Sequence, residues 1–155
     1  MIPAVEQLIP HRPPMQLLER VLRWEGDRVQ AEVLVAAGGT FLDQNKVSAV
    51  VGLEYLAQAA SAFFTLAASD HNPPRPGMLI ACPSFTCAVD TFDLDARLLI
   101  TVHLASRLPT AREHNALVKF RGEIHALQNP GQSGNPSAAT AIGPALVSAE
   151  LSVYL

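Results

Sequence analysis

Cysteine is scarce in this chain, which has only Cys82 and Cys87 in 155 residues. No further cysteine or histidine cluster accompanies them, so the sequence argues against a disulfide framework and against a zinc site. Two reduced thiols are typical of a cytoplasmic protein, and we expect this protein to be cytoplasmic.

Charge is scarce as well. Charged residues make up 16% of the chain, the net charge is -3, and lysine and arginine form no run. This balance gives no indication of a nucleic-acid partner. The segment Met1 to Pro10 also lacks the basic start and long apolar run of a secretory signal.

Motifs that hold cofactors are missing. The chain has no glycine-rich phosphate loop and no cluster of His and Cys ligands, so we expect no metal, nucleotide or other cofactor. No convincing membrane span is present either. The most apolar stretch is interrupted by four polar residues, namely Glu54, Gln58, Ser61 and Thr65.

Apolar residues, by contrast, are abundant. Because the chain is 49% hydrophobic, it can build a large core, or a core together with a hydrophobic subunit interface. Its length predicts one domain over residues 1–155.

The apolar stretch Val51 to Leu66 is the centre of the sequence. It is rich in Ala, Leu and Phe and contains no proline, which predicts a helix with Ser48 as its N-cap and an end near Ser69. Since nearly every face of this helix is apolar, we expect it to be buried.

Two polar residues, Glu54 and Gln58, interrupt this helix four positions apart and therefore on one face. A carboxylate inside an apolar helix is costly unless it is paired or used. Glu54 is therefore the first candidate for a functional residue. The alternative is a buried Glu paired with an arginine such as Arg12 or Arg20.

Strands are predicted on both sides of the helix. Val29 to Val35 alternates apolar and polar residues after the turn signal Gly26-Asp27, which predicts a hairpin with a strand over Met15 to Trp24. A helical turn is expected at Val5 to Ile9, a loop at Thr40 to Ser48 and an exposed loop at Asn129 to Ser137. Four further strands are expected at Met78 to Val89, Leu98 to Leu108, Asn115 to Leu127 and Ala138 to Leu155. Pro83 predicts a bulge or a sheet edge in the first of these strands, and Gly143-Pro144 predicts a bend in the last.

This order favours an α+β fold in which about six antiparallel strands form a curved sheet around one long helix. Six strands leave sheet edges to be covered, and edge-to-edge pairing in a dimer is one solution.

Two motifs resemble the 3-hydroxyacyl-ACP dehydratases of fatty acid synthesis, the FabZ/FabA group. They are Leu8-Ile9-Pro10-His11-Arg12-Pro13, followed by an apolar strand, and Glu54-Tyr55-Leu56-Ala57-Gln58. The chain is more similar still to the divergent dehydratase-like proteins of aryl polyene biosynthesis clusters. That similarity lies in Val51-Gly52-Leu53-Glu54, in Gly77-Met78-Leu79-Ile80 and in the ending Leu151-Ser152-Val153-Tyr154.

The resemblance implies the hotdog fold, usually dimeric, and dehydration of 3-hydroxyacyl thioesters carried by an acyl carrier protein. It implies that Glu54 is catalytic, that Gln58 orients it in a substrate-binding role, and that Ala81 replaces a glycine whose amide polarises the thioester carbonyl. One departure is clear: the family's catalytic His precedes the helix Glu by about fourteen residues, where this chain has Thr40-Phe41-Leu42.

His11 is the candidate for the missing imidazole, if its loop folds over the helix. The alternative is structural, because the dehydratases carry a His here in addition to their catalytic one. Asp43 is a further candidate carboxylate, as in thioesterase-type hotdog proteins. Ordinary surface or core roles are expected for three of the other histidines, namely His103, His114 and His125. His71 is expected to be solvated in its proline-rich connector, and Cys82 and Cys87 are expected to be thiols of the core.

Three functions follow from these residues. The first is a dehydratase-like protein that acts on or binds 3-hydroxyacyl groups on an acyl carrier protein. It would act either alone as a homodimer or as a heterodimer with a conventional dehydratase subunit that supplies the His. The second is an acyl thioesterase, and the third is a non-catalytic acyl-binding or scaffolding subunit.

Overall fold

The computed structural model describes residues 1–68, 76–111, 115–128 and 140–155. Its elements in chain order are α1 (Val5–Leu8), β1 (Arg20–Glu25), β2 (Arg28–Leu34), β3 (Lys46–Ser48), the 3-10 turn η1 (Ala49–Val51), α2 (Gly52–Ala67), β4 (Met78–Cys87), β5 (Thr91–Asp93), β6 (Arg97–Pro109), β7 (Ala116–Leu127) and β8 (Ala141–Tyr154). The predicted loop Asn129 to Ser137, and His71 and His114, lie outside the described residues.

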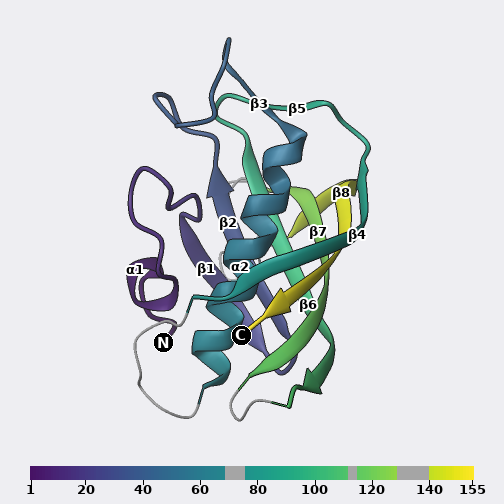
Figure 1. Ribbon diagram of the computed structural model, residues 1–155. Coiled ribbons are helices and arrows are strands. Elements are labelled where there is room, and N and C mark those ends of the chain that lie inside the picture. The colour runs from purple at the N-terminus through teal and green to yellow at the C-terminus, as the bar shows by residue number, and fades with distance from the viewer. Residues whose placement is uncertain (69–75, 112–114, 129–139) are drawn as a thin grey trace.

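Six strands form one antiparallel sheet in the order β1-β2-β6-β7-β8-β4, which curves around α2 (Figure 1). Alternate residues of β7 point to the helix and are buried, as expected for a sheet with one face on the core. The predicted α+β arrangement of one helix inside a curved sheet is therefore present.

The helix and the sheet approach closely because β7 carries a glycine at the contact. A Cβ at Gly122 would lie 2.6 Å from Leu56 Cδ2, and Leu56 on α2 is fully buried. Gly52, at the start of α2, leaves similar room for the Ile124 side chain. These contacts set the depth at which the helix lies, and with it the position of Glu54.

The first strand is shorter than predicted. It begins at Arg20, and the residues from Met15 to Leu18 before it are bound to α2 instead of joining the sheet. The reason is that the backbone groups of Met15, Leu17 and Leu18 hydrogen-bond to the Gln58 side chain rather than to a neighbouring strand. An apolar run cannot by itself distinguish these two outcomes.

The loop predicted over Thr40 to Ser48 ends in a short strand. β3 pairs with β5 in a separate two-stranded sheet above the N-terminal end of α2 (Figure 1). Both strands have three residues, which is too short for a periodic signal.

The edge and the bend were predicted correctly. β4 is the last strand of the six-stranded sheet, and its register shifts between Ala81 and Ser84, around Pro83. Gly143 has a φ of 69°, a left-handed conformation that glycine adopts readily, inside β8.

The helix is not wrapped on all sides, contrary to the expectation. Leu53, Ala57 and Phe64 on one face are only half-buried, because the edge strand β4 crosses that face at a single place (Figure 1). The segment Ala49–Ala67 is long and apolar enough to cross a membrane by length and composition, which is weak evidence, since half of it is buried in the protein.

We expect Gly122→Ala to destabilise the protein by about 1–3 kcal/mol, because the added methyl would lie within 3.3 Å of three side-chain atoms of the fully buried Leu56. Urea unfolding measures this cost. The double variant with Leu56→Ala should be less destabilised than the sum of the two single variants. Additive effects would contradict the contact.

Candidate active site

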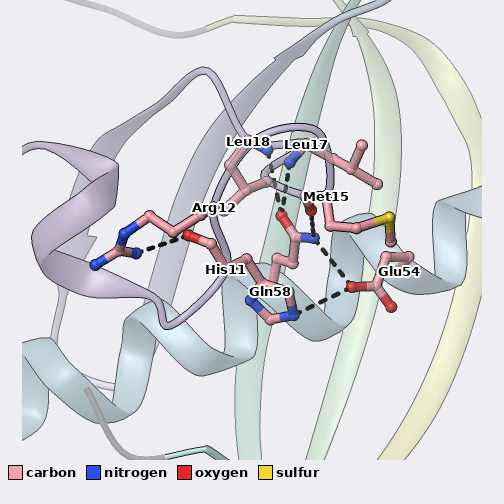
Figure 2. Close-up of polar contacts among 7 residues, drawn as sticks. All are labelled: His11, Arg12, Met15, Leu17, Leu18, Glu54 and Gln58. Atoms are coloured by element: carbon pink, nitrogen blue, oxygen red, sulfur yellow. Dashed lines mark hydrogen bonds and ion pairs between the residues drawn. The ribbon is translucent and has the colours of Figure 1, made fainter. Parts of the chain in front are cut away.

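The segment Ile9–Glu19, called the strap here, lies across α2 and is fastened to it by one side chain. Gln58, which is fully buried, accepts hydrogen bonds from the backbone N–H groups of Leu17 (3.0 Å) and Leu18 (3.4 Å) through Oε1. Its Nε2 donates to the Met15 carbonyl (2.7 Å), as Figure 2 shows. The amide therefore replaces the strand partners that these backbone groups lack.

Gln58 also touches the candidate carboxylate. Its Nε2 donates a second hydrogen bond to Glu54 Oε1, at 3.0 Å (Figure 2). The spacing of four residues on one helix face makes this contact possible, as the sequence indicated. One buried amide thus holds both the strap and Glu54.

The strap brings His11 to Glu54. His11 Nε2 lies 3.4 Å from Glu54 Oε1, on the same oxygen that Gln58 contacts (Figure 2). The two side chains are 32% and 36% exposed, so they can be reached from outside. The other ring nitrogen, Nδ1, is buried and has no hydrogen-bond partner among the described residues. The accessible nitrogen is therefore the one beside the carboxylate.

A cavity of about 240 Å³ opens beside this pair. Its walls come from the strap, from one face of α2, from the start of β4 and from the end of β8, with Pro10, His11, Glu54, Ala57, Ser61, Phe64, Pro76, Gly77, Leu79 and Val153 as lining residues. Apart from His11, Glu54 and Ser61, these residues are apolar. The cavity thus places the contacting His11 and Glu54 side chains beside a mostly apolar wall.

Neither arginine considered as a partner of Glu54 reaches it. The Arg12 guanidinium donates to the carbonyls of Ile9 (2.9 Å) and His11 (2.7 Å) and stabilises the bend of the strap. Arg20 pairs with the buried Glu32 on β2, and Arg97 binds the same carboxylate. Among the described residues, Glu54 therefore has no ion pair with an arginine.

The other sequence candidates lie elsewhere. Ala81 is exposed on β4, outside the residues that line the cavity, and Asp43 belongs to the exposed loop before β3. His103 is exposed on the outer face of the sheet, and His125 lies 3.8 Å from Glu123. In the described part of the chain, no three His, Cys, Asp or Glu side chains are grouped to hold a metal.

The cysteines are not in the core, where the sequence led us to expect them. Cys82 is half-buried and Cys87 is exposed, because both lie on the edge strand. Burial raises the pKa of the Cys82 thiol. Partial burial and the nearby Asp90 carboxylate raise the pKa of the Cys87 thiol. Less thiolate is then present at neutral pH, which disfavours a nucleophilic role.

The cavity residues Pro76, Gly77 and Leu79 were missed as site residues. They follow the proline-rich connector and belong to the stretch Gly77-Met78-Leu79-Ile80 that resembles the family. That resemblance was the available signal, but only the path of β4 across α2 shows that they face Glu54.

Comparison with known proteins identifies the family. The family model described as ApeP dehydratase, of the ApeP-like group, matches residues 3–154. The chain therefore belongs to the ApeP-like dehydratase family. No curated protein sequence matches this ApeP-like chain significantly.

Solved structures agree with this assignment. The dehydratase heterocomplex ApeI:P from Xenorhabdus doucetiae contains a chain that is 25% identical, with a TM-score of 0.71 over 99% of this chain and 91% of that one. A thioesterase-like protein from Ralstonia eutropha, related to phenylacetic acid degradation, has 10% identity and a TM-score of 0.56 over 87% and 83%. Zebrafish thioesterase superfamily member 2 has 10% identity and a TM-score of 0.56 over 88% and 80%.

The two thioesterases share the fold alone with this ApeP-like chain. The protein has the hotdog fold, as the sequence predicted, and is dehydratase-like.

Replacing Gln58 by Leu should release the strap. The variant leaves two strap N–H groups and one carbonyl without partners, at a cost of about 1–3 kcal/mol for each group that stays buried. We expect lower stability and faster hydrogen exchange at the Leu17 and Leu18 amides, measured by NMR. Amides in the β6–β7 ladder serve as the internal control. Equal acceleration in both regions would contradict a local role for Gln58.

Proposed function

We propose that this protein dehydrates 3-hydroxyacyl thioesters on an acyl carrier protein, with Glu54 and His11 as its acid–base pair. The observation that supports this proposal is the 3.4 Å approach of His11 Nε2 to Glu54 Oε1 at the mouth of an apolar cavity. The family's catalytic His is absent from its usual position, and the strap offers an imidazole from a different part of the chain.

The reaction needs a base at C2 and an acid for the hydroxyl on C3. In the proposed reaction, His11 Nε2 takes the C2 proton and the electron pair forms the C2–C3 double bond. The C3–O bond breaks as the protonated Glu54 carboxyl gives its proton to the leaving oxygen, which departs as water. Glu54 thus loses its proton to the departing water while His11 gains the proton from C2, so the number of protons on the pair is unchanged. Their direct contact returns the proton for the next turnover.

Gln58 has a positioning role in this scheme. Its amide N–H holds Glu54 Oε1 at 3.0 Å and leaves Oε2 outside that bond. The same amide also holds the strap that carries His11. Gln58 therefore fixes the positions of both His11 and Glu54. Ala81, the proposed source of a backbone N–H for the thioester carbonyl, lies on the edge strand that also supplies Leu79 to the cavity wall.

The test is turnover of a 3-hydroxyacyl carrier-protein substrate, followed by formation of the conjugated enoyl product. We expect Glu54→Gln and His11→Asn each to lower the rate by about 10²–10⁴-fold, the range of general acid–base catalysis. His103→Asn, a histidine exposed on the outer face of the sheet, is the matched control and should leave the rate unchanged.

Full activity of His11→Asn would overturn the role of His11. Release of the thiol without formation of a double bond would point instead to a thioesterase.

We further propose that β4 pairs with a second hotdog subunit, either another copy or a conventional dehydratase. β4 has a free edge, carries no charged residue, and exposes Met78, Leu79 and Ile80. Apolar strand edges without charges are prone to pair with another strand. The similar chain in the ApeI:P heterocomplex supports a heteromeric partner.

Lysines at Met78 and Ile80 should prevent this pairing by placing charges in the subunit interface. Light scattering after size exclusion should then show a monomer, both alone and mixed with a conventional dehydratase. Trp24→Lys on β1, the opposite edge of the same sheet, is the control because Trp24 is also an exposed apolar residue. Loss of the complex only in the Trp24 variant would place the interface on β1 and overturn the proposed pairing through β4.

A further inference from the structure

The groove beside the acid–base pair has a fixed length. Its helix wall consists of Glu54, Ala57, Ser61 and Phe64, residues three or four positions apart that therefore lie on one face of α2. Ala57 and Ser61 are small and leave an open path along the helix. Phe64 is the first large side chain on that path after the carboxylate.

Phe64 is held in place by its neighbours. Its ring makes edge-to-face contacts with Phe63 (centroids 6.0 Å apart) and Phe120 (5.4 Å), and both of these rings are buried. Phe63 and Phe120 also contact each other at 5.4 Å. A ring inside such a cluster cannot swing aside without losing these contacts, so Phe64 acts as a rigid wall.

The opposite side of the groove is formed by residues of β4 and β8 and by Gly77 just before β4. Gly77 and Leu79 at the start of β4 face Val153 at the end of β8, and a Cβ at Gly77 would lie 3.0 Å from Val153 Cγ1. The two strands are thus in close contact there.

The dimensions of the groove give a chain length. Glu54 and Phe64 are ten residues apart, which is ~15 Å along a helix. A carbon–carbon contact at the ring takes up about 4 Å of this length. At about 1.2 Å per bond of an extended chain, roughly nine bonds fit beyond the reacting carbons. The cavity volume of about 240 Å³ also lies below that of ordinary ligand pockets, which begin near 300 Å³.

We infer that Phe64 limits the substrate to acyl chains of about twelve carbons or fewer. This inference rests on the proposed function, because it places C2 and C3 beside His11 and Glu54. The acyl tail then runs along Ala57 and Ser61 and ends against the Phe64 ring, and the carrier approaches from the end at which the acid–base pair lies. Phe64 is a specificity-determining residue in this arrangement.

The test is a series of 3-hydroxyacyl carrier-protein substrates from six to sixteen carbons, measured as kcat/KM. We expect at least a tenfold fall beyond about twelve carbons. Phe64→Ala should move this limit up by about three carbons, since it removes the ring from the path. Ser61→Leu should move it down by about four carbons, because it places a bulky side chain one turn nearer to Glu54.

Ser61→Leu breaks no hydrogen bond, as Ser61 Oγ has no partner within the described residues, so its effect is steric. Leu66→Ala is the matched control. It shortens a partly buried side chain of α2 that does not line the cavity and takes no part in the ring cluster, so it should keep the wild-type limit. Thermal melts establish that each variant is folded.

Binding of saturated acyl-pantetheines, which cannot be dehydrated, is measured in parallel. No turnover at any length, with a binding limit that shifts in the Phe64 and Ser61 variants, would overturn the proposed reaction and retain the role of Phe64. Turnover or binding that is equal for ten and sixteen carbons, or a limit unchanged in Phe64→Ala, would overturn the role of Phe64.

Discussion

The hydrogen bonds of one buried amide organise the candidate site of this molecule. Gln58 joins three backbone groups of the strap to the Glu54 carboxylate from the middle of an apolar helix. A buried amide is stable only when its donors and acceptors are satisfied, and here the strap and Glu54 satisfy them. The segment before β1 therefore crosses the helix instead of extending the sheet, and His11 is carried to Glu54 as a result.

The sheet supplies the second constraint. Glycine at position 122 lets α2 lie close to β7, and the core closes around Leu56. The six strands cover the helix on the side of β2, β6 and β7 and leave the face of Leu53, Ala57 and Phe64 half-buried. A fold with one open helix face has space beside the helix for a substrate chain. The same arrangement leaves the uncharged edge of β4 free for another subunit.

These two features meet at the cavity. The strap contributes the imidazole, the helix contributes the carboxylate and the small residues, and the start of β4 contributes the opposite wall. A dehydratase needs proton transfer at one end of such a groove and room for an apolar chain along the rest. The edge strand therefore has two roles in our proposal, as wall of the groove and as contact for a partner. A partner subunit on β4 would then lie directly beside the site.

The sequence by itself determined the architecture and indicated Glu54 as the first candidate site residue. Helix-forming apolar residues without proline specify α2, alternating strands specify the sheet, and a carboxylate and an amide four residues apart mark the functional face. The motifs at His11 and Glu54 also indicated the family to which the chain belongs.

Only the tertiary structure decided that His11 lies beside Glu54, that neither Arg12 nor Arg20 pairs with that carboxylate, and that Pro76, Gly77 and Leu79 line the same cavity. The physical reason is that these contacts join residues far apart in the chain. Local periodicity carries no information about which buried donor a distant backbone group will meet. The apolar run of Met15 to Trp24 could join a sheet or pack on a helix, and hydrogen bonds to the buried amide of Gln58 hold its first residues on the helix.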